Sequence, residues 1–169
     1  EVCGFRMTLI DCGTIDSSII VETDQTYHLN LNDCDFTKSQ LQKIKDLLNN
    51  HKKVIVYMQF SYAAFRSDDE WLYKASKYKL EKLVEIYNFF NADLLIPFAS
   101  FIYFSSPENF RLNKHMNRVQ STSDYLKKNN IKYCILNPDE HEIDIVKIIN
   151  DLNLRNSITH NSVNFWDTK

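Results

Sequence analysis

One acidic residue, Asp33, stands where a carboxylate can reach a metal ion or a substrate. The segments 16–21 and 27–34 predict two β-strands joined by a short polar turn, and the second strand ends in Asn32-Asp33-Cys34. A sheet that delivers a carboxylate into the loop at a strand end is a common arrangement at metal and substrate sites. One carboxylate alone is not a site, and an Asp at a strand end is more often a turn or cap residue.

Polar residues alternate along the same predicted strand. His28, Asn30 and Asn32 have the period of two that places side chains on one face of a strand. This pattern indicates either a polar face beside a site or a plain solvent-exposed strand face, and the second interpretation is favoured.

Several kinds of catalytic and nucleotide-binding site are excluded or weakly supported. The chain has two glycines, Gly4 and Gly13, so neither a P-loop nor a dinucleotide-binding fingerprint can be written. No serine stands in a Gly-x-Ser-x-Gly turn. The acids at 68–70 are explained by their place at a predicted helix start. Phe98, Phe101, Tyr103 and Phe104 are predicted to be core rather than a base-stacking platform, because no basic groove accompanies them.

Composition places the chain among ordinary globular proteins. Its 169 residues (20.0 kDa) and 44% hydrophobic content predict a single domain over 1–169 with a sizeable core. A net charge of −2 and a pI of about 6.2 argue against nucleic acid as a partner. The lysines at 74, 77, 79 and 82 are expected on a solvated helix face. No apolar run is long enough to span a membrane. Four cysteines without a Cys-x-x-Cys pair favour reduced thiols and a cytoplasmic location: Cys3, Cys12, Cys34 and Cys134.

Hydrophobic periodicity predicts an α/β fold in which an antiparallel β portion precedes alternating strands and helices. A Thr-x-x-Gln capping box at Thr37 marks the first helix, predicted from Thr37 to Asn50. The segment 101–104 is expected to continue the preceding strand or to form a helical turn, and no element is assigned after Leu154. The other expected elements are strands at 7–10, 16–21, 27–33, 54–58, 94–98 and 132–136, helices at 68–90, 119–129 and 143–152, and a polar loop at 107–115.

This order of elements resembles the second half of a metallo-β-lactamase-fold domain, an αββα sandwich with a metal site at one edge of its sheets. The resemblance covers about Met7 to Leu152 and is closest to a branch that includes sugar-locus hydrolases and the sialic-acid hydroxylase. It is carried by Asp16-Ser17-Ser18-Ile19-Ile20-Val21, Leu29-Asn30-Leu31-Asn32-Asp33-Cys34, Ile96-Pro97-Phe98-Ala99-Ser100-Phe101 and Leu136-Asn137-Pro138.

The resemblance implies a metal-dependent hydrolase. Asp33 would bridge two divalent metal ions, zinc first, with iron or manganese as alternatives, and the metals would activate a water molecule. The loop at 107–115 would border the substrate pocket. Asn109, Arg111, Asn113 and His115 would then contact a small anionic or sugar-derived substrate, although an ordinary surface loop explains these residues equally well.

The chain departs from the family pattern in its missing metal ligands. The family's His-x-His-x-Asp-His motif is absent, because the histidines are His28, His51, His115, His141 and His160. Where the family has a Gly-His-Thr-like turn, this chain has Cys12-Gly13-Thr14-Ile15. Cys12 is the only nearby group able to bind a metal as a thiolate, and a packed cysteine is the commoner case.

Two explanations fit the missing histidines. In the favoured one, the sequence is the carboxyl-terminal part of a longer protein, because it begins at Glu1 within a β region. Hydrolase activity would then need the amino-terminal segment, and this segment or another chain, including a second copy, would cover an exposed sheet face. In the other explanation, the chain is a degenerate copy that lacks the metal site. The alternative function is a non-catalytic α/β interaction module.

Overall fold

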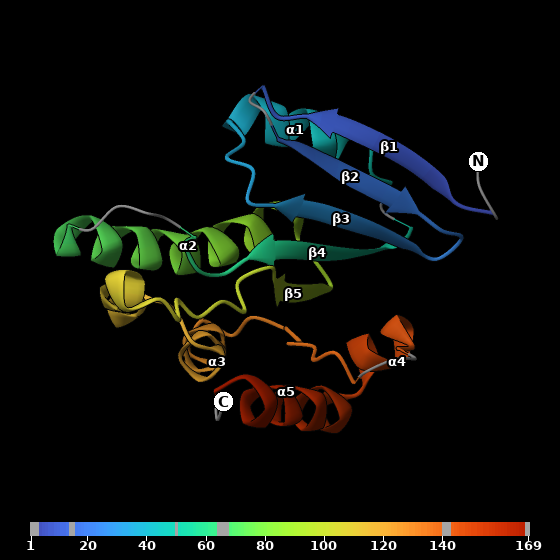
Figure 1. Cartoon of the computed structure of the whole chain (residues 1–169). Coiled ribbons are helices and arrows are strands. Elements are labelled where there is room, and N and C mark those ends of the chain that lie inside the picture. Colours follow the sequence, from blue (N-terminus) through green and yellow to red (C-terminus); the bar gives the residue numbers. More distant parts are fainter. Residues whose placement is uncertain (1–3, 14–15, 50, 64–67, 140–142, 168–169) are drawn as a thin grey trace.

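A computed structural model describes residues 4–13, 16–49, 51–63, 68–139 and 143–167 of the chain. Several residues named above lie outside the described residues: Glu1, Cys3, Thr14, Ile15, Asn50 and His141. The described part is built on one mixed sheet with helices on its faces and beyond one edge (Figure 1). No helix of the described ranges has the length and apolar character needed to cross a bilayer.

The sheet has five strands in the spatial order β1-β2-β3-β4-β5. The first three strands pair antiparallel, and β3, β4 and β5 pair parallel, which confirms the predicted α/β class and its antiparallel beginning. The strands are β1 (Arg6–Asp11), β2 (Ser17–Glu22), β3 (Thr26–Asn32), β4 (Lys53–Gln59) and β5 (Leu94–Phe98).

The helices begin and end at recognisable caps. The predicted capping box opens the first helix: Thr37 Oγ1 accepts a hydrogen bond from Gln40 N–H, and Gln40 Oε1 accepts one from Thr37 N–H at 2.9 Å. Asp68 caps the second helix, which ends at Asn91 in the left-handed conformation (φ 50°). The helices are α1 (Lys38–Asp46), α2 (Asp69–Phe90), the 3₁₀ helix η1 (Pro107–His115), α3 (Val119–Lys128), α4 (Ile145–Asn150) and α5 (Leu152–Asp167).

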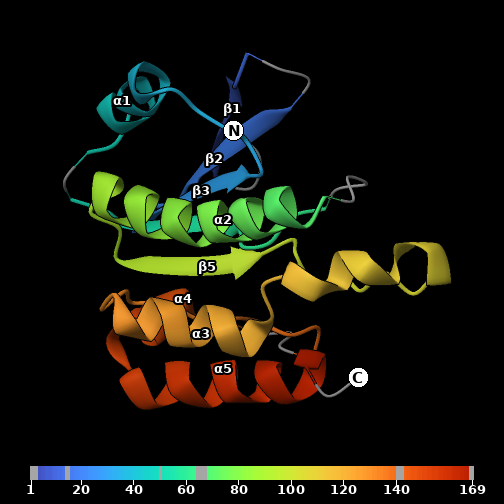
Figure 2. The ribbon, with the colours of Figure 1, turned by 90° about the vertical axis from the view of Figure 1, so that its left-hand side faces the viewer.

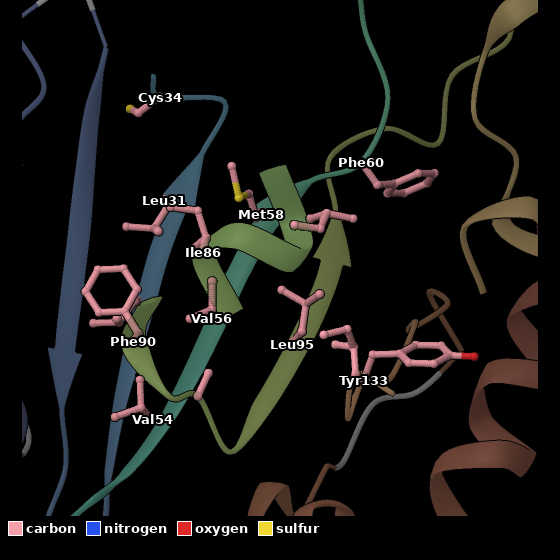
Figure 3. Close-up of a cluster of buried hydrophobic side chains, with 14 of the residues drawn as sticks. Leu31, Cys34, Val54, Val56, Met58, Phe60, Ile86, Phe90, Leu95 and Tyr133 are labelled. Carbon is pink, nitrogen blue, oxygen red and sulfur yellow. The ribbon is translucent and has the colours of Figure 1, made fainter. Parts of the chain in front are cut away.

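One face of the sheet is covered by α1 and α2. Val56 and Met58 on β4 and Leu31 on β3 are buried against Ile86 of α2, within a cluster that also holds Leu41 and Ile44 of α1 (Figure 3). Apolar side chains therefore fill the space between β3–β5 and these helices, as expected for an α/β layer.

The opposite face is covered only in part. Leu9, Ile19, Asn30, Tyr57 and Ile96 are register partners across the five strands, so their side chains share this face. Exposure rises along the row from 1% at Ile96 to 75% at Leu9. The β5 end packs against α4 and α5, which lie beyond β5 in Figure 1, whereas the β1 end is open.

Four sequence-based expectations about elements need correction. The predicted strand at 132–136 makes a single parallel bridge, between Tyr133 and Leu95, because only these residues come into register with β5. The segment 101–104 has no regular structure, and the predicted loop at 107–115 is the 3₁₀ helix η1. The predicted helix at 143–152 is two helices that meet at Asp151.

The corner between α4 and α5 is held by a buried arginine. Arg155 is 9% exposed, and its Nη1 donates to the carbonyl oxygens of Ile148 and Ile149, both at 2.7 Å. These carbonyls belong to the last turn of α4, where no intrahelical donor reaches them. The guanidinium group of this α5 residue therefore caps the carboxyl end of α4.

Because one face of the sheet is covered more completely than the other, shortening a side chain should destabilise the protein by different amounts on the two faces. Leu29 is fully buried, so Leu29→Ala should lower the free energy of unfolding by about 2–5 kcal/mol. The matched control Leu9→Ala removes the same atoms from a side chain that is 75% exposed, and should change it by less than about 0.5 kcal/mol. Urea denaturation followed by circular dichroism measures both. Equal losses in the two variants would contradict this description of the two faces.

Candidate functional site

The carboxyl ends of the parallel strands meet at one edge of the sheet, which is where open α/β sheets bind ligands. Asp33 follows β3 there, in a turn closed by the hydrogen bond from Cys34 N–H to the Leu31 carbonyl oxygen (3.1 Å). Asn32, at φ 50°, stands at an irregularity in the pairing with β4 and turns the chain out of the sheet. Asp33 is exposed, and its carboxylate makes no hydrogen bond or ion pair with the described residues.

Asp33 has no set of companion ligands within the described residues. No group of three or more His, Cys, Asp or Glu side chains is placed to hold a metal ion in that part of the chain. The surrounding geometry therefore supplies one carboxylate and no preformed metal centre.

The cysteines near Asp33 are packing residues. Cys12 and Cys34 are buried in the same apolar cluster, and Cys12 Sγ lies in hydrogen-bond contact with the Asp16 carbonyl oxygen. Burial, with a smaller contribution from the neighbouring Cys12 thiol, raises the pKa of Cys34 to about 11. A thiol that stays protonated at neutral pH is a poor metal ligand and nucleophile. For Cys12, burial and the contact with the Asp16 carbonyl oxygen favour the packed-cysteine interpretation.

The four predicted substrate residues lie on η1, which is drawn in yellow beyond the end of β5 in Figure 2. Asn109 and Arg111 are exposed. The Asn113 side chain is occupied, because it accepts from Phe104 N–H (2.9 Å) and donates to the Phe104 carbonyl oxygen (2.8 Å). It therefore supports the preceding loop.

His115 is the least exposed ionisable group of η1. Its ring lies edge-on to Tyr73 with centroids 6.0 Å apart, and its Nε2 is 3.9 Å from Asp69 Oδ1. Nε2 is buried and has no hydrogen-bond partner among the described residues. The hydrogen bond from Lys114 lowers the pKa of Asp69, so this acid is ionised beside the histidine.

The described contacts do not bring η1 and Asp33 together. Both approach α2, but at different places: Asp69 contacts Lys114 of η1, while Tyr78 donates to Asp35, close to Asp33. Residues 69 and 78 are nine apart, which is about 13 Å along a helix.

A polar cluster lies on the partly open face of the sheet. His28 Nε2 is 2.9 Å from Thr26 Oγ1, and His28 Nδ1 is 2.8 Å from the hydroxyl of Tyr57 on β4. Burial lowers the pKa of His28 and raises that of Tyr57 to about 12, so both groups are neutral near pH 7. A neutral imidazole accepts at one nitrogen and donates at the other, which suits these two hydroxyl partners.

His28 and Asn30 share a face as predicted, but both are half-buried rather than fully exposed. The register shift after Asn30 pairs Asn32 with Met58, a residue of the helix-covered face, so the predicted alternation does not extend to Asn32. The buried Asn30 Oδ1 has no hydrogen-bond partner among the described residues. Tyr57 was not recognised from the sequence, because it lies inside an otherwise apolar strand. Its pairing opposite Asn30 follows from the sheet register, which local patterns do not contain.

An aromatic cleft opens beside the same carboxyl edge. It has a volume of about 810 Å³ and lies between the segment after β5, the start of α3 and the end of α5. Tyr103, predicted as core, is 53% exposed there. The sequence contains two signals of this cleft, the four aromatic residues within 98–104 and the Phe165-Trp166 pair. The two groups come together only because of α5, a helix that was not predicted.

Comparison of the chain with protein-family models, curated proteins and solved structures finds no match of any of the three kinds. The functional argument therefore depends on the geometry.

The His28 environment predicts a pH-dependent stability. Since burial lowers its pKa in the folded state, the unfolded chain takes up the proton first as the pH falls below about 6.5. The stabilising contribution of neutral His28 is complete above that pH and is lost progressively below it, until the folded-state pKa is reached. The loss is at most about 1.4 kcal/mol per pH unit.

Urea unfolding at pH 7.5 and 5.5 measures this loss. His28→Gln should show a smaller decrease between the two pH values than the unsubstituted protein, whereas the control His160→Gln, at an exposed position, should keep the original decrease. If His28→Gln left the pH dependence unchanged, burial of the imidazole would not be its cause.

The raised pKa of Cys34 predicts slow alkylation. With a pKa of about 11, only about one thiol in a thousand is ionised at pH 8. Iodoacetamide should label Cys34 about 100-fold more slowly in the folded protein than in urea, as followed by peptide mass spectrometry. Similar rates in the two states would show that the thiol is accessible and reactive.

Proposed function

We propose that this chain supplies one half of a metal-dependent hydrolase of the metallo-β-lactamase fold, in which a metal-activated water attacks an anionic or sugar-derived substrate. The observation that carries the proposal is the unequal covering of the sheet. One face is sealed by α1 and α2, and the other is open and apolar at Met7 and Leu9. One half of an αββα sandwich requires a sheet with one helix-covered face and one face able to pack on a second sheet, and the strip at β1 and β2 is the part of this face that α4 and α5 leave uncovered.

Asp33 is the one metal ligand that the proposal assigns to this chain. Two observations support this assignment. Asp33 is exposed at the carboxyl edge of the parallel strands, and its carboxylate is unpaired among the described residues. These residues do not themselves fit a complete metal site, since no three potential ligands converge there. The other ligands would come from a segment that adds the second sheet, and no catalytic step is derived without them.

The exposed side chains of η1 are assigned to substrate. Asn109 and Arg111 are free of the internal hydrogen bonds that occupy Asn113 and are accessible to a small anionic molecule. Arg111 would form charge-assisted hydrogen bonds to an anionic group. Asn113 would act indirectly, by holding the loop at Phe104.

A second candidate is a non-catalytic α/β module that binds a protein partner. The exposed side chains of Met7 and Leu9 on β1 favour it as well, because neighbouring exposed apolar side chains mark interaction surfaces. Under this alternative Asp33 is a turn residue, and the absence of a ligand cluster in the described residues needs no completion.

Metal analysis of the full-length polypeptide separates the two candidates. The hydrolase should contain zinc, iron or manganese at one or two equivalents. Asp33→Ala should lower metal affinity by at least about 100-fold, since loss of an outer-shell partner alone costs 10–100-fold. Mass-spectrometric metal content after dialysis measures this.

Asp24→Ala is the matched control, because Asp24 is also exposed, in the turn between β2 and β3. It should leave the metal content unchanged. A full-length protein without stoichiometric metal would reject the hydrolase, and the interaction module would then remain.

A further inference from the structure

The aromatic cleft combines a ligand-sized volume with an end wall of stacked rings. Phe101 and Trp166 lie nearly parallel, at 14° with centroids 4.3 Å apart, although they come from distant parts of the chain. Phe165 packs edge-on to Trp166 at 4.8 Å. The volume of about 810 Å³ lies within the range of 300–1,000 Å³ typical of small-molecule sites.

Two helix ends form part of the cleft wall. α3 and α5 contact each other and run side by side in Figure 2, where the end of α5 lies near the start of α3. Residues of these two helix ends line the cleft. The Asp167 carboxylate accepts hydrogen bonds from Val119 N–H (3.1 Å) and Gln120 N–H (2.7 Å), and so joins the two helix ends. Trp166 Nε1 donates to the Leu136 carbonyl oxygen at 3.4 Å, which fixes the indole ring.

One cation in this cleft is available to a ligand. The Arg118 guanidinium lies 5.1 Å from the centre of the Tyr103 ring, and it forms no ion pair with a carboxylate of the described residues. Both acids that line the cleft accept hydrogen bonds from neighbouring residues of its wall. Asp167 caps α3, and Asp124, which is exposed, accepts from the Gln120 side chain at 2.8 Å.

From these features we propose that the cleft binds a flat aromatic molecule carrying one anionic group, such as an aromatic carboxylate. The ring lies against Trp166 and Tyr103, and the anion accepts hydrogen bonds from Arg118. Aromatic faces bind flat rings by offset stacking, and a planar guanidinium group matches a carboxylate in geometry and charge. This site is independent of the proposed metal chemistry, because it uses neither Asp33 nor η1.

Three probes of equal ring size test the proposal: 2-naphthoate (anionic), 2-naphthamide (neutral) and 2-naphthylmethylamine (cationic). Isothermal titration calorimetry should give 2-naphthoate the tightest binding, with a Kd of about 1 mM or lower, and the amine the weakest. In a ¹H–¹⁵N spectrum, 2-naphthoate should shift the Trp166 indole signal. Trp71, which does not line the cleft, is the internal reference.

Arg118→Gln should weaken 2-naphthoate about tenfold or more and change 2-naphthamide less than about twofold. Arg6→Gln is the matched control, because Arg6 is an exposed arginine of β1 outside the cleft, and it should change none of the three affinities. Tyr103→Leu removes the aromatic ring at a side chain that is 53% exposed, and it should weaken all three probes.

Absence of saturable binding would overturn the proposal. So would tightest binding of the amine, because the acids would then dominate the cleft. An unchanged preference for 2-naphthoate in Arg118→Gln would equally overturn the role of the guanidinium. The metal content of the full-length protein is measured separately, so failure of this proposal leaves the hydrolase proposal unaffected.

Discussion

The burial of β4 on both faces is the constraint on which the rest of the structure depends. Residues 54–56, 58 and 59 are buried, so the peptide groups of this strand need hydrogen-bonding partners along both edges. β3 and β5 supply them in parallel register, and parallel neighbours need long connections, which here are α1 and α2. Those helices seal one face, while α4 and α5 cover Ile55 and the neighbouring part of the other. Asp33 and the aromatic cleft both lie where parallel strands end, because that is where the chain leaves this packed centre.

The fold was predictable wherever a local pattern agreed with the role of the element in the whole. The strand at 94–98 has the bounds expected from its apolar run. The run at 132–136 has a similar composition but makes one bridge, because strand length depends on register with a neighbour. α5 was not predicted because part of its buried face is polar. Arg155, Thr159 and Ser162 are buried through hydrogen bonds to main-chain groups, which leave no hydrophobic period in the sequence.

The candidate site was predictable to a smaller extent. The place of Asp33 follows from alternation within its own strand, and the structure has it at the strand end as expected. Its companions depend on contacts between distant segments. Tyr57 meets His28 from 29 residues away, and Trp166 meets Phe101 only because α5 returns alongside α3. Neither pair leaves a periodic signal in the sequence, since each of these residues fits the local pattern of its own segment. The geometry alone shows which of these side chains are neighbours.

The guanidinium group at the corner between α4 and α5 also limits which residues that corner can accept during evolution. Arg155 reaches two adjacent carbonyl oxygens with a planar group that is weakly hydrated for a cation. Lysine would bring a compact, strongly hydrated charge into the same small space, and an apolar residue would leave both carbonyls without a donor. The exposed neighbours Asn156 and Ser157 are under no such restriction. Among related chains we therefore expect position 155 to vary least of the three, for reasons of helix termination and not of activity.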